Sequence, residues 1–300
     1  MGTTGVTGKI ARQDWLKPVE DTLRKGVQRA YESGGPRGRK IKNWLHGTWL
    51  GHPLHAVLTD VPIGAWTAAM CFDLVDAIGD REEFGKAADA ALMVGIAGAL
   101  GAAVAGLTDW QDTDPPARRI GLVHGLMNVG SVALFTGSLV ARKRDSRGLG
   151  RGLSALAYAL ATVAAQFGGE LVYGQRVGVD HSAGQKLPED FVPVLAESEL
   201  REGTPQRVRY EGVPILLVRR GNRVFALAET CSHMGGPLSE GRLIDDSVKC
   251  PWHGSQFSLE DGRVLDGPAV HPQPCLDARV RNGQIEVRKA SGQPLVRTAT

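Results

Sequence analysis

Four long apolar segments occupy most of the first 175 residues of the chain. They span residues 54–78, 88–108, 120–141 and 152–173. The second and third carry no Asp, Glu, Lys or Arg over most of their length, whereas a soluble helical bundle would show charged stripes. Because about 20 helical residues cross the hydrocarbon core of a bilayer, the pattern predicts four membrane-spanning helices. The first is the weakest, since Asp60, Asp73 and Asp76 interrupt it.

A different pattern begins near residue 190, where short β-type runs alternate with turn pairs. The runs cover residues 208–210, 215–218, 224–227 and 284–287. Gly221-Asn222, Asp261-Gly262 and Asn282-Gly283 are hairpin turn signals between such runs. The sequence therefore predicts a two-domain protein, with an N-terminal α-helical transmembrane four-helix bundle and a small C-terminal all-β domain.

The change of pattern also predicts the domain boundaries. They are a basic leader over 1–45, a four-helix membrane domain over 46–175, a linker over 176–189, an all-β domain over 190–289 and a tail over 290–300. Apolar residues at helical spacing over 14–32 predict a helix in the leader, either resting on acidic headgroups or solvated. The leader has no apolar core typical of a secretory signal.

Composition adds two limits. The net charge of +3 is too small to indicate a nucleic-acid partner. Of the four cysteines, two fall in one motif and Cys71 lies in an apolar segment, so no disulfide framework is expected.

The candidate chemistry lies in two short Gly/Pro-rich loops. One contains Cys231-Ser-His233 and the other Cys250-Pro-Trp-His253. Two thiolates and two imidazoles predict a metal centre, and a structural Cys2His2 zinc site is one interpretation. The Cys-x-His spacing is tighter than the zinc pattern, however. Together with the His-Gly-Ser-x-Phe continuation, it resembles the Rieske [2Fe-2S] proteins.

This resemblance implies specific roles for the motif residues. Cys231 and Cys250 would ligate one iron, His233 and His253 the outer iron, and Ser255 would donate a hydrogen bond to the cluster. The respiratory-complex subgroup has a disulfide between the two loops and a Tyr hydroxyl near the cluster. Here those positions read Gly236, Trp252 and Phe257. The chain thus resembles the ferredoxin-type members, and a low reduction potential is expected.

The membrane half contains a second recognisable pattern, Gly51-His-Pro-Leu-His55 followed by Asp60-Val-Pro-Ile-Gly64. It resembles an uncharacterised bacterial family of four-helix membrane proteins, with Ala56 where a proline often follows the second His. No activity comes with this resemblance.

Ionisable residues near the helix ends are the other candidate site. Four antiparallel crossings would gather them at the membrane face from which the linker to the β domain leaves. They are His52 and His55 at the start of the first helix, Asp60 within it, Asp109, His124 and Glu170. Three interpretations remain open: a b-type haem ligated by His55 and His124, a quinone pocket, and structural pairing of the histidines with the carboxylates. His46, His181 and His271 are expected at the surface or in the linker.

The function that these patterns predict is one-electron transfer by a membrane-bound Rieske protein, coupled to a haem or quinone in the bundle. We expect a multi-pass protein of the bacterial inner membrane with its Rieske domain in the cytoplasm. The electron donor, the acceptor and the oligomeric state are unknown. Two alternatives are a membrane-tethered ferredoxin that feeds an oxygenase and a non-redox, zinc-stabilised interaction protein. An oxygenase itself would need a second iron in a large soluble domain, for which no sequence remains.

Overall fold

The computed structural model describes residues 5–79 and 81–290. The chain folds into two compact units. The helical unit comprises Met1–Gly38 and Leu54–Val177, and the β unit comprises Arg39–Pro53 and Gly178–Thr300. The predicted fold class, four candidate membrane helices followed by an all-β domain, is confirmed. The predicted tail falls outside the described residues, apart from Ala290.

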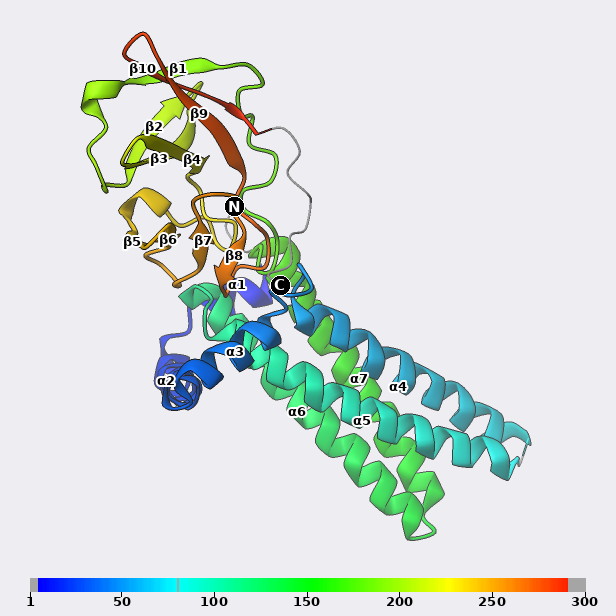
Figure 1. Ribbon diagram of the computed structural model, residues 1–300. Coiled ribbons are helices and arrows are strands. Elements are labelled where there is room, and N and C mark those ends of the chain that lie inside the picture. Colours follow the sequence, from blue (N-terminus) through cyan, green and yellow to red (C-terminus); the bar gives the residue numbers. More distant parts are fainter. Residues whose placement is uncertain (1–4, 80, 291–300) are drawn as a thin grey trace. The chain divides into compact units, whose positions relative to one another are not determined.

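Four long helices form the bulk of the helical unit (Figure 1). They are α4 (Leu54–Gly79), α5 (Glu82–Trp110), α6 (Pro115–Lys143) and α7 (Arg147–Gly169), which η2 (Glu170–Gly174) extends. All four are long and apolar enough to cross a membrane. Two begin earlier than their apolar segments. Glu82 and Glu83 favour the positive N-terminal end of α5, and Pro115 suits the first turn of α6.

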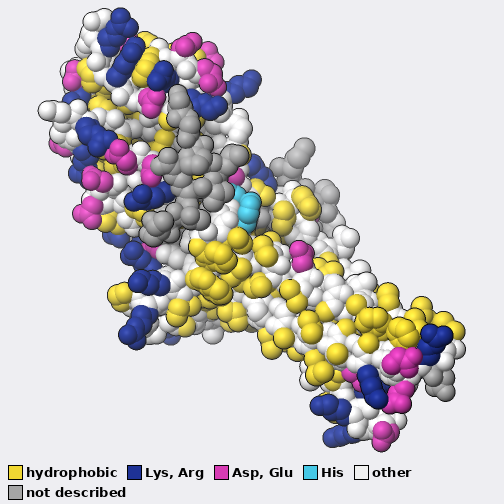
Figure 2. All heavy atoms as spheres, turned by 45° about the vertical axis from the view of Figure 1, so that its right-hand side comes forward, with side chains coloured by type: hydrophobic (Ala, Val, Ile, Leu, Met, Phe, Trp, Pro, Cys, Tyr) yellow, Lys and Arg dark blue, Asp and Glu magenta, His cyan; other side chains and the backbone are white. Residues whose placement is uncertain are grey.

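The helices pair as two hairpins, α4 with α5 and α6 with α7. Gly95 shows how closely the first pair approaches, since a Cβ there would lie 2.2 Å from Nε1 of Trp66. Small residues at such crossings let helices pack tightly in lipid. The outward faces are apolar, and Figure 2 shows hydrophobic side chains over the long helices. Exposed examples are Val57, Ile63, Met93, Val129 and Leu156.

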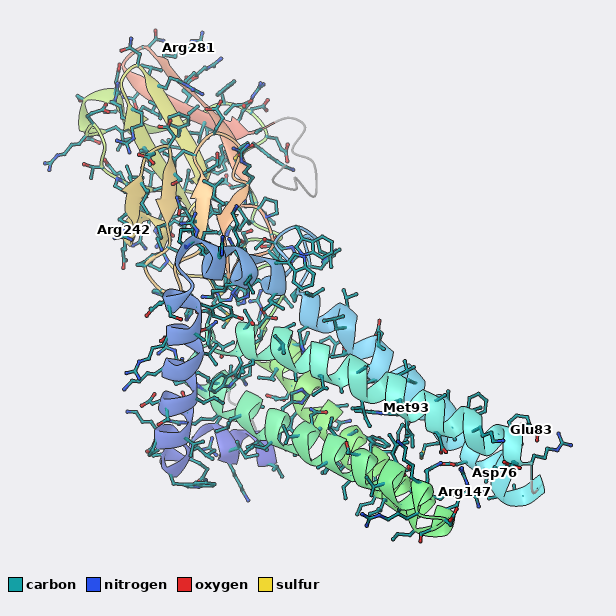
Figure 3. All side chains as sticks on the ribbon, turned by 60° about the horizontal axis from the view of Figure 1, so that its bottom comes forward. Asp76, Glu83, Met93, Arg147, Arg242 and Arg281 are labelled. Atoms are coloured by element: carbon teal, nitrogen blue, oxygen red, sulfur yellow. The ribbon has the colours of Figure 1, made fainter. Side chains whose placement is uncertain are left out.

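Ion pairs close the end of the bundle where each hairpin turns. The Arg142 side chain is 1% exposed and donates to Asp73 Oδ1 at 2.7 Å and to Asp89 Oδ1 at 2.9 Å. Arg147 lies 3.9 Å from Asp76, and Figure 3 shows the two side by side. Asp73 and Asp76, two of the three aspartates that interrupt the first apolar segment, are therefore paired across helices.

Four short helices precede the bundle: α1 (Val6–Ala11), η1 (Asp14–Leu16), α2 (Lys17–Ser33) and α3 (Gly35–His46). The helix predicted over 14–32 is present, mainly as α2. It is fixed to the helical unit by a buried ion pair between Glu20 and Arg118. The helix α3 was not predicted.

The β unit consists of two antiparallel sheets. The larger has the order β1-β10-β9-β4-β3-β2 and the smaller β5-β6-β7-β8. The strands are β1 (Val192–Ala196), β2 (Gln206–Tyr210), β3 (Val213–Arg220), β4 (Arg223–Ala228), β5 (Arg242–Ile244), β6 (Ser247–Lys249), β7 (Gln256–Ser258), β8 (Val264–Asp266), β9 (Cys275–Arg281) and β10 (Gln284–Lys289). The four predicted runs all lie within strands, at β2, β3, β4 and β10.

The segment Arg39–Pro53 belongs to the β unit, although it precedes the four long helices and the rest of that unit follows them. Asn43 Oδ1 accepts a hydrogen bond from the Gly267 N–H at 3.0 Å, and Arg39 lies 3.6 Å from Asp266. The His46 side chain is 1% exposed and lies against Gly267. The expectation of a surface position for His46 was wrong, because residues more than 200 positions later cover it.

Candidate metal centre

The two motif loops share one backbone design. In each, the cysteine N–H donates to the carbonyl five residues later, from Cys231 to Gly236 and from Cys250 to Ser255, both at 2.8 Å. The residue before each acceptor is a glycine with positive φ, at +79° for Gly235 and +83° for Gly254. Since only glycine adopts this conformation without strain, the glycines let each loop curl around its cysteine.

The two thiols lie together in the core of the β unit, at 1% exposure for Cys231 and 4% for Cys250. A hydrogen bond between them lowers the pKa of Cys250 to about 7 and, with burial, raises the pKa of Cys231 well above its ordinary value. The pair therefore gives up its first proton much more readily than its second.

Backbone amides are aimed at both sulfur atoms. Those of His233 and Met234 donate to Cys231, and those of Trp252 and His253 donate to Cys250. Each N–H lowers the pKa of the thiol that it contacts, because it stabilises the negative sulfur. The loops are thus built to hold thiolates, the form of cysteine that binds metal.

The two motif histidines form a second pair beside the cysteines. The rings of His233 and His253 lie 5.1 Å apart at an interplanar angle of 82°, and both side chains are half-buried. Within residues 5–79 and 81–290, no three His, Cys, Asp or Glu side chains are grouped so that they could hold one metal ion. Two buried thiols and two half-buried imidazoles, each pair drawn from both loops, are the donor set that a two-iron Rieske cluster requires.

Residues outside the motif hold the first loop in place. The Ser232 N–H donates to Gln273 Oε1 at 3.1 Å, and its hydroxyl donates to the His271 carbonyl at 2.8 Å. The buried Gln273 amide donates in turn to the Ala228 and Thr230 carbonyls. Gln273 was not predicted, because nothing in its local sequence, Pro272-Gln273-Pro274, indicates that it contacts residues some 40 positions earlier.

The positions that distinguish Rieske subgroups are well defined. A Cβ on Gly236 would lie 2.9 Å from Cys250 Sγ, so the loops meet there without a side chain between them. Trp252 is 53% exposed, and Phe257 is fully buried. Ser255 is also fully buried, and its oxygen accepts the Ala269 N–H at 3.0 Å, which leaves its hydroxyl proton to donate.

The histidine near the start of α4 does not lie where the sequence analysis expected it. His52 lies before α4, which begins at Leu54, and Pro53 separates the two residues. It belongs to the β unit, where its ring lies 5.9 Å from that of His271. His52 and His55 therefore do not share a helix face, and the grouping of His52 with His55 and His124 stays a prediction.

The remaining membrane candidates are arranged differently from the structural pairing considered above. His55 and His124 face each other with ring centroids 6.5 Å apart. Each ring Nδ1 contacts a backbone carbonyl at 2.8 Å, that of Ala102 or Ala164, instead of a carboxylate. Of the other three candidates, Asp60 is exposed on α4, Asp109 lies at the end of α5, and Glu170 accepts a hydrogen bond from Gln175 at 3.2 Å.

Comparison with known proteins assigns both halves of the chain. Residues 190–295 match the Rieske [2Fe-2S] domain family, and residues 51–181 match the family described as predicted membrane protein (DUF2231). Ferredoxin CarAc of Metapseudomonas resinovorans is 33% identical over 98 residues, which are 32% of this chain and 92% of that protein. The 3-phenylpropionate/cinnamic acid dioxygenase ferredoxin subunit of Escherichia coli K12 is 34% identical over the same shares.

Among solved structures, the ferredoxin of carbazole 1,9a-dioxygenase from Nocardioides aromaticivorans IC177 is 27% identical, with a TM-score of 0.32. The match covers 34% of this chain and all of that one. The family matches and the ferredoxin relatives show that this chain belongs to the Rieske [2Fe-2S] family through its β unit and carries a DUF2231 membrane domain in its helical unit.

Proposed function

We propose that this protein is a membrane-bound one-electron carrier with a ferredoxin-type Rieske cluster. The observation that carries the proposal is the matched pair of loops, which place two buried thiols beside two half-buried imidazoles. Cys231 and Cys250 would hold the inner iron, and His233 and His253 the outer one. When bound, the cluster supplies a one-electron couple.

The protein residues have separate tasks in this function. The amides directed at Cys231 and Cys250 stabilise the thiolates, and burial keeps water from them. The half-buried imidazoles of His233 and His253, beside the exposed Trp252, form the surface through which an electron would enter and leave. A soluble partner would dock over this surface.

The surroundings of the site favour a low reduction potential. Hydrogen bonds to cluster sulfur and to its ligands stabilise the reduced, more negative state and so raise the potential. Ser255 keeps one such donor, but the side chain of Phe257 offers none. Gly236 and Trp252 stand where the high-potential subgroup has the two cysteines of its disulfide, so that link between the loops is missing here.

We infer the partners from the ferredoxin relatives. One of them is a dioxygenase ferredoxin subunit, which supports a terminal oxygenase as the electron acceptor. The donor would be a reductase or a membrane component. The four candidate spans support a multi-pass protein, which we place in the bacterial inner membrane with the Rieske domain in the cytoplasm.

Metal and sulfide analysis of the full-length protein in detergent tests the cluster. We expect two iron atoms and two acid-labile sulfides per chain, and loss of both in Cys231→Ser and Cys250→Ser. Arg223→Ala, on a solvated part of β4, is the control and should keep both. Zinc without sulfide would instead support the zinc-stabilised interaction protein and would rule out electron transfer.

We also propose that the helical unit holds a second redox group, either a haem or a quinone, that exchanges electrons with the Rieske cluster. The facing pair of His55 and His124 favours it, because intramembrane ionisable groups are costly unless they have a function.

A further inference from the structure

The helical unit contains an internal repeat. Residues of α4 and residues 69 positions later in α6 meet in pairs along the bundle. At one end His55 faces His124, in the middle Trp66 stacks on Phe135 at 4.3 Å, and at the other end Asp73 binds Arg142. Equivalent residues meet in this way when two similar hairpins are related by an approximate twofold axis along the bundle. The histidine pair lies on that axis.

The repeat extends to the helices that support the histidines. His55 Nδ1 contacts the Ala102 carbonyl of α5, and His124 Nδ1 contacts the Ala164 carbonyl of α7, both at 2.8 Å. Four residues after each carbonyl is a glycine. A Cβ on Gly106 would lie 2.7 Å from the ring of His55, and one on Gly168 would lie 3.3 Å from that of His124. Both hairpins thus hold a histidine in the same way.

These contacts determine which ring nitrogen is left for a ligand. A carbonyl oxygen only accepts, so Nδ1 carries the proton in both rings and Nε2 carries the lone pair. A backbone carbonyl on Nδ1 is the usual support for a histidine that binds metal through Nε2. The Asn128 amide is 3.3 Å from His124 Nε2, a long contact, and its shorter hydrogen bond, 2.9 Å, goes to the His124 carbonyl.

The number of ligands narrows the choice of metal group. Two imidazole rings lie near each other here, and the described residues contain no group of three or more His, Cys, Asp or Glu side chains that could hold an ion. A haem needs no more than two protein ligands, because the porphyrin supplies the other four. A quinone carbonyl would need a donor, and Nε2 in this tautomer accepts.

Small residues leave open space beside both histidine turns. A Cβ added to Gly125 would meet no atom within 4 Å, and one added to Gly101 would meet only a Leu58 methyl at 3.8 Å. Both histidine side chains are half-buried. Each histidine turn therefore has room for at least one more carbon atom beside it.

We propose that the helical unit binds one b-type haem with His55 and His124 as its axial ligands. This deepens the second part of the proposed function and rests on it. The Rieske cluster belongs to the other unit, so its presence is measured independently.

The test uses the full-length protein in detergent, titrated with haemin. We expect one haem per chain with a low-spin optical spectrum in both redox states. Because the imidazole planes are at 90°, the ferric EPR signal should be strongly anisotropic. His55→Ala and His124→Ala should each lose the low-spin spectrum, and added imidazole should restore it. His52→Ala, three positions before His55 and outside the bundle, is the matched control and should bind haem normally.

The Rieske EPR signal and a single gel-filtration peak report folding of each variant. The haem proposal fails if wild-type protein with an intact Rieske signal binds no low-spin haem, or if both alanine variants keep it. It also fails if the protein instead binds a ubiquinone analogue that both variants lose. None of these results would bear on the proposed Rieske cluster, which would be contradicted instead by missing iron and sulfide.

Discussion

Ser255 and Phe257 lie two positions apart after the second motif loop and should influence the cluster potential in opposite ways. Ser255 has a proton to donate, since its oxygen accepts the Ala269 N–H. Phe257 fills the core of the β unit and donates nothing. Residue-scale chemistry of this kind separates a low-potential from a high-potential Rieske protein.

Ser255→Ala should lower the midpoint potential without loss of iron. Loss of a hydrogen bond to a charged group costs about 1.5–3 kcal/mol, or roughly 60–130 mV for a one-electron couple. Protein-film voltammetry measures the shift. An unchanged potential with full iron content would show that the hydroxyl does not reach the cluster.

The converse change is Phe257→Tyr, which offers a hydroxyl where the high-potential subgroup has one. We expect the potential to rise. Phe257→Leu, which adds no donor, is the control for repacking, and an equal shift in both variants would mean that packing rather than hydrogen bonding sets the potential.

His271 should make the stability of the β unit depend on pH. Burial lowers the pKa of its imidazole below the ordinary value near 6.5. As pH falls through about 6.5 the unfolded chain takes up this proton first, so stability is full above that pH and decreases below it. His271→Gln keeps the backbone carbonyl that accepts the Ser232 hydrogen bond. In this variant the thermal unfolding midpoint should change less between pH 7 and pH 5 than it does in wild type. A slope equal to that of wild type would exclude His271 as its source.

At the scale of elements, the buried charges at the turn end of the bundle hold the two hairpins together. Arg142 on α6 binds Asp73 on α4 and Asp89 on α5. Asp73→Ala would leave a buried guanidinium short of a partner and should cost about 3–5 kcal/mol of unfolding free energy. Unfolding in mixed SDS micelles measures it.

The double variant Asp73→Leu/Arg142→Met is the matched comparison, because it removes both charges at similar volume. It should be more stable than Asp73→Ala. If Asp73→Ala costs less than about 1 kcal/mol, the pair is solvated and does not join the hairpins.

A stacked pair of tryptophans, Trp44 of α3 and Trp49 of the following turn, precedes α4. Trp44 and Trp49 lie 6.2 Å apart with an angle of 13° and are 56% and 44% exposed. The first membrane helix begins at Leu54, and tryptophan favours the membrane interface. The fluorescence of these two tryptophans is the difference between wild type and the variant Trp44→Phe/Trp49→Phe. We expect lipids brominated near the headgroup to quench it more than lipids brominated at the chain end. Quenching by aqueous iodide alone would contradict an interfacial position.

Element boundaries show what local sequence predicts and what it cannot. The four membrane helices and the strands β2, β3, β4 and β10 have strong apolar patterns and were predicted. The strands β5–β8 have three residues each, which is too short for an alternating apolar pattern to be recognised. The motif residues were predicted because their chemistry and spacing are local.

At the scale of the whole molecule, contacts between distant residues were beyond prediction. The segment Arg39–Pro53 reads as a basic leader, yet Asn43 and His46 pack against Gly267. His52 likewise packs against His271, more than 200 positions later in the chain. The chain therefore contributes residues to the β unit both before and after the membrane helices. No periodic pattern in the sequence indicates this contribution.

Transfer of one electron by a low-potential Rieske cluster can be measured by EPR-monitored redox titration of the full-length protein in membranes. We expect a Rieske signal that appears on reduction by one electron, with a midpoint near the low end of the family range, about −150 mV. A midpoint near the high end, about +300 mV, or no iron–sulfur signal from fully metallated protein, would contradict it.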